Sequence, residues 1–243
     1  MRANALLILV SLATIPAGPV HAGAMTPDEI IAALMRPENS TGNIADAVEE
    51  ATGARGWMSA DMKPIFDARI AGRAATAMMR PVLRTDTRKY QNHLLEILDQ
   101  AEPGSVLVYV MEDGLEIAAM GNLMATTAKV RGLAGAVIDG AVRDVTELRR
   151  LQFPVWSRRV SPATSVGRMI SVDKQIPVRC AGILVNPGDY IVGDPDGVIV
   201  VPAGAAEKVV ALLKQYNEKE SKMIPIIERE KSMLKALEIY NRY

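Results

Sequence analysis

The sequence is poor in the residues that recognise nucleic acids, bind zinc or form disulfides. Aromatic residues make up 4% of the 243 residues, and 28 basic side chains balance 28 acidic ones. A chain with few stacking rings and no net charge is not expected to bind nucleic acid or an anionic membrane. Two histidines, His21 and His93, are too few for a zinc site, and a single cysteine, Cys180, excludes an internal disulfide. We expect Cys180 to be a small buried hydrophobe, and any metal to be oxygen-bound Mg²⁺ or Mn²⁺.

The first 22 residues have the outline of a secretory signal peptide. Arg2 supplies the positive charge, residues 5–15 form an apolar core, and residues 20–22 offer a cleavage site with small residues. The apolar run is too short, and too interrupted by prolines, to remain as a membrane span. We therefore expect a periplasmic or secreted protein if the signal is real. The open alternative is a cytoplasmic protein whose translation starts at Met25.

The remaining chain alternates between helical and strand patterns, as in an α/β protein. Capping residues and helical spacing predict helices within residues 27–35, 44–52, 85–100 and 203–222. Apolar runs predict strands within residues 69–79, 105–111, 115–119, 136–138, 154–157, 176–185 and 189–201. Pro225 is expected to interrupt the last helix. The predicted organisation is one large domain over residues 25–222 and a C-terminal helical extension over residues 223–243.

The stretch 120–147 combines features of a site for a small acid. Gly121 is expected to open a helix, which leaves the next three backbone amides without intrahelical partners and directed at an anion. These amides belong to Asn122, Leu123 and Met124. The following strand leads to Arg143, a bidentate donor for a carboxylate or a polarised carbonyl.

Asp144 follows directly, and its oxygens suit a hard divalent cation. From the residues alone, a simpler interpretation is favoured. Gly121 is then a helix cap, Arg143 and Asp144 are a solvated pair, and Glu147 belongs to the first turn of the next helix, where acids are favoured.

Four motifs together resemble one known family. They are Gly121-Asn-Leu-Met, Arg131-Gly132, Gly135-Ala-Val-Ile-Asp-Gly-Ala-Val and Arg143-Asp144-x-x-Glu147. The family is that of the class II 4-hydroxy-4-methyl-2-oxoglutarate/4-carboxy-4-hydroxy-2-oxoadipate aldolases, which includes the regulator of ribonuclease activity A. The similarity runs from about Asn43 to about Glu220. It implies a swivelling β/β/α sandwich that assembles into homotrimers or hexamers with sites between subunits.

The resemblance also implies roles for the residues of this stretch. A small 2-oxo acid would lay its carboxylate on the amides of residues 122–124, Asp144 would hold the metal, and Arg143 would donate to the keto oxygen. Glu147, and Glu220 of an adjacent subunit with Glu218 as fallback, would support the metal through its waters. The implied reaction is cleavage of a 4-hydroxy-2-oxo acid to pyruvate, or decarboxylation of an oxaloacetate-like acid, through a metal-stabilised enolate.

One position departs from the family pattern. The residue after Gly121 is often Asp or Glu in family enzymes, whereas here it is Asn122. An amide can position a water molecule but cannot accept its proton, so aldol cleavage loses its general base while decarboxylation does not need one. The alternative function is a non-catalytic, protein-binding regulator like the regulator of ribonuclease activity A. A methyltransferase is not expected, because no Gly-rich loop follows a first strand.

Two further groups of charges have simpler interpretations. Arg158 and Arg159 lie near a predicted strand end, where they would bind a second carboxylate or, as we favour, form solvated surface. Asp194 and Asp196 belong to a turn, because the spacing of a calcium loop and its closing glutamate are absent. Asp46 is assigned no catalytic role.

Overall fold

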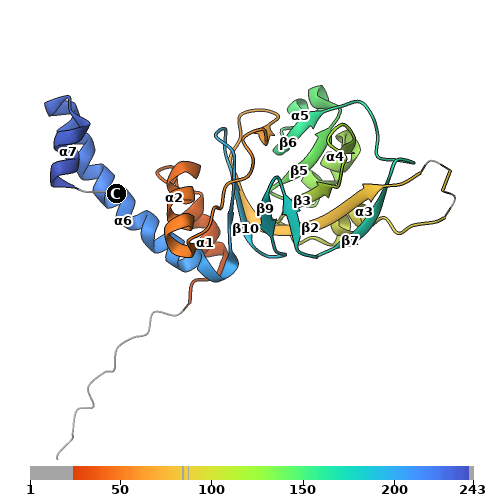
Figure 1. Ribbon diagram of the computed structural model, residues 1–243, viewed down its shortest axis with the longest axis horizontal. Helices are drawn as coiled ribbons and strands as arrows, with labels where there is room; N and C mark the ends of the chain where they lie inside the picture. Colours follow the sequence, from red (N-terminus) through yellow and green to blue (C-terminus); the bar gives the residue numbers. More distant parts are fainter. Residues whose placement is uncertain (1–23, 84, 87, 241–243) are drawn as a thin grey trace, which may run out of the picture.

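A computed structural model describes residues 24–83, 85–86 and 88–240. The predicted signal peptide, with His21, lies outside these residues. The described strands form a mixed sheet in the order β1-β6-β5-β3-β2-β10-β11, with β4 paired to β5 and β7 paired to β2, and a separate β8-β9 hairpin. Figure 1 shows the sheet between two groups of helices, with α3, α4 and α5 at one end and α1, α2 and α6 at the other. The predicted α/β class is confirmed.

The parallel centre of the sheet consists of β2 (Ile70–Pro81), β3 (Val106–Met111), β5 (Gly135–Val142) and β6 (Val155–Val160). The short β4 (Ala118–Met120) also runs parallel to β5. Antiparallel pairs add β1 (Lys63–Pro64), β7 (Met169–Lys174), β10 (Tyr190–Gly193) and β11 (Val198–Val201), and the hairpin joins β8 (Val178–Cys180) to β9 (Ile183–Val185). Parallel strands bring their carboxyl ends to one edge, where α/β folds place ligands.

The helices follow from local capping and burial. They are α1 (Pro27–Leu34), α2 (Thr41–Thr52), α3 (His93–Gln100), α4 (Asn122–Val130), α5 (Val145–Leu151), the 3₁₀ turn η1 (Ala203–Ala205), α6 (Ala206–Glu230) and α7 (Met233–Ile239). Thr26 and Glu29 close a capping box on α1, and Ser40 caps α2. Among the described helices, none combines the length and the apolar composition that crossing a membrane requires.

Three buried clusters hold these layers together. One lies between the sheet and α3, α4 and α5, where Tyr109, Ile138 and Leu148 are fully buried. A second covers the opposite face of the central strands around Trp156, and it includes Cys180, whose predicted burial is confirmed. The third joins β10 and β11 to α1, α2 and α6. The site edge of the parallel strands is thus built on two of these clusters, one on each face of the sheet.

The structure corrects several predicted boundaries. The helix predicted over 85–100 begins only at His93, because Asn92 caps it there, and the predicted strand 136–138 extends over the whole of β5. The helix α6 does not break at Pro225 but continues to Glu230 and ends at Lys231 in the left-handed conformation. A proline inside a helix costs about 3 kcal/mol, and burial of Met223 together with packing of α7 on α6 offsets this cost. The division at residue 222 therefore does not coincide with a helix end and stays a prediction.

Candidate functional site

A cavity of about 220 Å³ lies where β4 meets α4 and β5 meets α5. Its walls include the predicted stretch Gly121 to Met124 with Arg143 and Asp144, together with the start of α3 and residues 164–166. A larger cavity of about 460 Å³ lies near the amino end of β3, with Arg73 and Glu102 in its lining. We place the site in the smaller cavity, because its walls combine a guanidinium, a carboxylate and an open helix end.

The α4 helix presents its amino end to this cavity. Gly121 is the N-cap residue and supplies no side-chain cap. The Asn122 amide donates a hydrogen bond of 2.9 Å to Oδ2 of Asp144, so it is already occupied. The prediction of three open amides is therefore wrong for Asn122. The amides of Leu123 and Met124 come next in the first turn, where no carbonyl of the same helix lies in the i−4 position.

Asp144 is held in an unusual backbone conformation. Its φ of 58° and ψ of 41° are left-handed, and it precedes α5 without capping that helix through its side chain. Asp tolerates this conformation better than most residues, although it still costs free energy. As a result, the carboxylate contacts the start of α4 and not the start of its own helix.

Arg143 lies beside this carboxylate. Its backbone amide donates to the carbonyl of Met120 at 3.0 Å, which fixes the end of β5 against β4. Its Nε lies 3.7 Å from Oδ2 of Asp144, and the two side chains are 43% and 39% exposed. The two side chains are therefore held by protein contacts and still partly accessible to a ligand.

Gly121 is needed for this convergence because of space and not because of its φ of −138°. A Cβ at this position would lie 2.5 Å from Oδ2 of Asp144 and 3.0 Å from Nε of Arg143. Real Cβ atoms do not approach other atoms at 2.5 Å. The structure thus brings together the three features singled out in the sequence: the glycine at the helix start, the guanidinium and the aspartate.

The oxygen donors of the cavity suit one kind of metal. Among the residues that the structure describes, Asp144 is the only carboxylate that lines the cavity. No group of three or more His, Cys, Asp or Glu side chains suited to a metal occurs among the described residues. Zinc sites use at least three protein ligands, whereas Mg²⁺ often uses one or two carboxylates and keeps its waters. The donor set therefore fits Mg²⁺ or Mn²⁺ completed by water and substrate oxygens.

The two supporting glutamates lie outside the cavity lining. Glu147 belongs to the first turn of α5 and is partly buried. Glu220 lies on α6, where its Oε2 accepts a hydrogen bond of 3.3 Å from Nδ2 of Asn43 on α2. Figure 1 shows α6 and α4 at opposite ends of the molecule. Within one chain, Glu220 does not reach the cavity, and its role at the site of another subunit stays a prediction.

Several residues of the cavity were not predicted from the sequence. Asn92, Thr164, Ser165 and Val166 line it, together with Leu95 of α3. Asn92 is the N-cap of α3 and accepts a hydrogen bond of 3.2 Å from the Leu95 amide. Asparagine before an amphipathic helix is a capping signal, and the helix predicted from residue 85 concealed it. The segment 164–166 carries no comparable signal.

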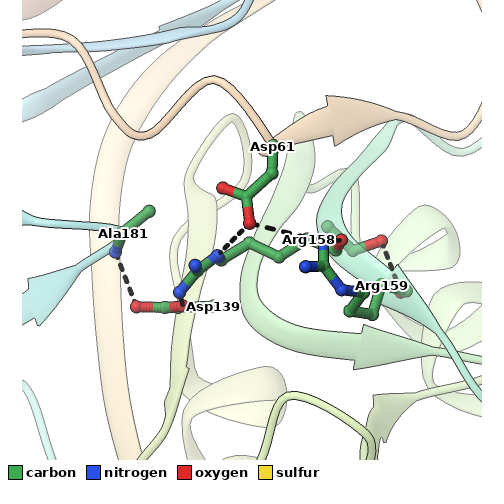
Figure 2. Close-up of polar contacts among 6 residues, drawn as sticks. Asp61, Asp139, Arg158, Arg159 and Ala181 are labelled. Carbon is green, nitrogen blue, oxygen red and sulfur yellow. Dashed lines mark hydrogen bonds and ion pairs between the residues drawn. The ribbon is translucent and has the colours of Figure 1, made fainter.

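Arg158 and Arg159 differ in their surroundings, and neither lines this cavity. Figure 2 shows Arg158 between two aspartates, with Nε 2.9 Å from Asp61 and Nη1 3.0 Å from Asp139. The second oxygen of Asp139 accepts from the Ala181 amide at 2.6 Å. The Arg158 side chain is 24% exposed and that of Arg159 is 52% exposed. The solvated-surface interpretation is therefore wrong for Arg158, which ties together β5, β6 and two loops.

Residues 41–200 match the sequence model of a family described as RraA-like: Aldolase/RraA. The chain belongs to this Aldolase/RraA family. The match covers most of the chain and includes every predicted site residue except Glu220. The predicted resemblance is confirmed, and with it the mixed α/β architecture carrying a C-terminal helix.

Individual members of the Aldolase/RraA family and related structures point the same way. A protein of Halalkalibacterium halodurans named "Putative 4-hydroxy-4-methyl-2-oxoglutarate aldolase" is 37% identical over 122 residues, which are 50% of this chain and 58% of that protein. The crystal structure of an uncharacterized protein from Pseudomonas syringae pv. tomato superposes with a TM-score of 0.75 at 26% identity, covering 87% of this chain and 99% of that one.

A third relative is described by a different function. Streptomyces coelicolor RraAS2 is described as an unusual member of the RNase ES inhibitor RraA protein family. It superposes with a TM-score of 0.70 at 25% identity, covering 82% of this chain and 97% of that one. The family therefore includes proteins named for a lyase activity and proteins named for ribonuclease inhibition.

Proposed function

We propose that this chain is a lyase that releases pyruvate from a small 2-oxo acid with the help of Mg²⁺ or Mn²⁺. The observation that carries the proposal is the convergence of Arg143, Asp144 and the Gly121 helix start on one cavity. The family and the aldolase name of one relative support it. The substrate would be either a 4-hydroxy-2-oxo acid or an oxaloacetate-like acid.

The helix start provides the first contact with the substrate. A carboxylate accepts hydrogen bonds well from first-turn amides, because they are unpaired and lie at the positive end of the helix dipole. The Asn122 amide is occupied by Asp144. The amides of Leu123 and Met124 are therefore the ones that would hold the 2-oxo acid's carboxylate.

Arg143 acts on the keto oxygen. As the carbon–carbon bond breaks, its electron pair moves onto the keto carbon's neighbour and negative charge develops on the keto oxygen. A guanidinium already fixed beside the site stabilises this charge without reorganisation. Asp144 would hold the divalent metal, which supplies Lewis-acid stabilisation of the same oxygen when bound.

The fate of the proton separates the two reactions. Aldol cleavage requires removal of the 4-hydroxyl proton, whereas decarboxylation releases CO₂ and needs only a later proton from water. Asn122 turns its Oδ1 toward the hydroxyl of Thr126 at 3.4 Å, and an amide accepts no proton in any case. We therefore favour decarboxylation of an oxaloacetate-like acid as the faster reaction and aldol cleavage as the slower one.

We also propose that the working site includes a second copy of the chain, in a homotrimer or hexamer. Large apolar side chains surround the cavity, with Leu123 81% exposed and Val166 78% exposed. Such exposure at a site is costly unless another surface covers it. Glu220 of a neighbouring copy would then approach the metal's waters.

A metal-dependent pyruvate assay tests the proposal. Purified protein with Mg²⁺ or Mn²⁺ is expected to release pyruvate from oxaloacetate or a 4-hydroxy-2-oxo diacid above the metal-only rate, and EDTA should abolish the increase. Arg143→Ala and Asp144→Ala should each lower the rate about 100-fold or more. Arg36→Ala, an exposed arginine beyond α1, serves as the matched control. Release that is indifferent to EDTA and to Arg143→Ala contradicts the proposal.

The alternative is a non-catalytic regulator that binds a protein, and the likeness to RraAS2 favours it. In that case no acid of the panel would yield pyruvate. The protein would instead inhibit a ribonuclease at stoichiometric concentration, and this inhibition would survive Asp144→Ala.

A further inference from the structure

An irregularity interrupts the pairing of β5 with β6 shortly before the site. The pairing is regular up to Ile138 and resumes at Ala141. Between these two residues, Asp139 and Gly140 of β5 lie opposite a single residue of β6, Arg158. Two residues against one define a β-bulge, which is rare between parallel strands and common beside active sites. A bulge bends its strand and re-aims the side chains that follow it.

We propose that Asp139 and Arg158 are positioning residues, which place Arg143 by holding this bulge. The last residue of β5, Val142, comes three positions after Asp139, and Arg143 follows it directly. The Arg143 amide donates to the Met120 carbonyl at 3.0 Å, so the end of β5 is placed against β4 at the cavity of the site. Neither Asp139 nor Arg158 lines that cavity, so their effect must pass through the backbone of β5. The inference rests on the proposed function, in which Arg143 acts on the keto oxygen.

The Asp139 carboxylate is bonded through both of its oxygens, as Figure 2 shows. Oδ1 lies 3.0 Å from Nη1 of Arg158, and Oδ2 accepts a hydrogen bond of 2.6 Å from the Ala181 amide. Arg158 is held in turn by Asp61, whose Oδ2 lies 2.9 Å from its Nε. A planar guanidinium that is bonded to two carboxylates has a fixed orientation. The first residue of the bulge is therefore tied to the residue that lies opposite the bulge.

The second residue of the bulge, Gly140, has no space for a side chain. A Cβ at this position would lie 2.5 Å from Cγ and 2.9 Å from Cβ of Met111, the last residue of β3. Both atoms are close to the β3 backbone, so they cannot move aside as the tip of a flexible side chain would. The bulge is thus closely packed against β3 and bonded to β6 and to the β8–β9 hairpin.

The displacement that the bulge controls is larger than catalysis tolerates. Closing the bulge would move the end of β5 by one residue relative to β6, which is about 3.3 Å. A displacement of about 1 Å is enough to lower a rate about 100-fold. Partial relaxation of the bulge should therefore reduce the rate even though the fold is kept.

The substitution Asp139→Asn perturbs the bulge without changing the size of the side chain. An asparagine has one accepting oxygen, and its NH₂ group is a donor. This group would face either the Arg158 guanidinium or the Ala181 amide, and both of these are donors as well. One of the two bonds of residue 139 is therefore lost, and the bulge is expected to relax.

Steady-state kinetics of Asp139→Asn, Arg158→Met and the double variant test the proposal, at a temperature at which all three are folded. For pyruvate release from oxaloacetate with Mg²⁺, we expect each single substitution to lower kcat about tenfold to a hundredfold. KM should change less than about threefold, because the amides that would hold the carboxylate belong to α4 and Arg143 acts in the transition state. The double variant should be no slower than the slower single variant, since the two residues act as one unit.

Arg159→Met is the matched control, because Arg159 pairs with Asp61 and does not contact Asp139. It should keep the wild-type kcat. A pair that only stabilises the fold would leave kcat unchanged in protein that is fully folded. Wild-type kcat in Asp139→Asn, or losses that multiply in the double variant, would therefore overturn the proposal.

Amide hydrogen exchange separates failure of this inference from failure of the proposed function, because it needs no turnover. In Asp139→Asn, the Arg143 amide should exchange about tenfold faster than in the wild-type protein, as its hydrogen bond to Met120 loosens. The Ala136 amide, which donates to the Pro154 carbonyl at 3.0 Å near the start of β5, should change little. Loss of global stability alone would accelerate both amides equally.

Equal acceleration of the two amides, or no acceleration of Arg143, refutes the positioning role. If the wild-type protein releases no pyruvate but the Arg143 amide alone exchanges faster in Asp139→Asn, the lyase proposal fails and the positioning role stands.

Discussion

The substitution Gly121→Ala tests the geometry of the site with one methyl group. The added Cβ would lie 2.5 Å from Oδ2 of Asp144, about 0.9 Å closer than the 3.4 Å at which ordinary contact begins. Asp144 is anchored by its left-handed backbone and by the Asn122 amide, so it cannot rotate away without losing that hydrogen bond. We therefore expect the carboxylate of Asp144 to shift by nearly 1 Å and the neighbouring guanidinium of Arg143, whose Nε would lie 3.0 Å from the new Cβ, to shift by about 0.4 Å.

A displacement of this size is expensive for catalysis and cheap for folding. Misplacement of reacting groups by 1 Å lowers rates by about 100-fold, which corresponds to about 2.7 kcal/mol of transition-state stabilisation. Because the affected side chains are around 40% exposed, the free energy of unfolding should fall by only about 1 kcal/mol.

A coupled assay with lactate dehydrogenase measures pyruvate release, and urea unfolding measures stability. Gly204→Ala is the matched control, because a Cβ there would meet no atom within 4 Å. The reasoning is refuted if Gly121→Ala keeps wild-type kcat/KM, or if its activity is lost only together with its fold.

Four further predictions follow from other parts of the structure. Arg158→Met leaves Asp139 without its cation and leaves Asp61 with Arg159 alone, whose Nη1 lies 3.3 Å from Oδ2 of Asp61. The free energy of unfolding in urea should therefore fall by about 2 kcal/mol, whereas Arg159→Met should cost less than about 1 kcal/mol. Burial acts to raise the pKa of Asp61, but hydrogen bonds, including that from Arg158, outweigh it and the net pKa is lowered. The resulting stability is therefore present above the unfolded aspartate pKa of about 4 and is lost as pH falls through the lower folded value. Urea midpoints measured from pH 6 down to pH 2.5 should fall less steeply in Arg158→Met than in the wild-type protein, and parallel curves would contradict this. Pro225→Ala restores a backbone donor inside α6. The protein should therefore unfold at a higher temperature, with a gain of up to about 3 kcal/mol in the free energy of unfolding. An unchanged melting temperature would show that Pro225 does not destabilise α6. Asn122→Asp supplies the missing proton acceptor, so the rate of pyruvate release from a 4-hydroxy-2-oxo acid should rise about tenfold or more. The rate of oxaloacetate decarboxylation should change little. An equal change in both rates would contradict the claim that aldol cleavage lacks a general base here.

The site stretch was predictable because its chemistry is local in the sequence. Gly121 stands directly before a helix, and Arg143 and Asp144 follow a buried strand, so a parallel sheet brings them to one edge. What the pattern did not contain was the use of one amide by Asp144. That contact depends on the left-handed backbone of Asp144, and no residue pattern distinguishes this aspartate from an ordinary helix cap.

The distal parts of the site were hidden because they depend on tertiary contacts. The apolar spacing around Leu94 and Leu98 extended the predicted helix back to residue 85, whereas Asn92 caps the helix so that it begins only at His93, and this cap places Asn92 in the cavity wall. Pro225 was expected to break α6, but packing of Met223 and α7 overrides the local preference. The spacing of apolar residues predicts which face of a helix is buried. It does not predict the tertiary contacts that determine where the helix begins or ends.

The central claim is that a guanidinium, an aspartate and a helix start hold one divalent metal and one 2-oxo acid. The most direct test is a crystal structure with Mn²⁺ and oxalate, whose two carboxylates imitate the enolate of pyruvate. We predict an anomalous peak for Mn²⁺ against the Asp144 carboxylate, with oxalate oxygens within hydrogen-bonding distance of Arg143 and of the Leu123 amide. Mn²⁺ and oxalate bound elsewhere, or an absent peak at Asp144 under saturating Mn²⁺, would contradict the account.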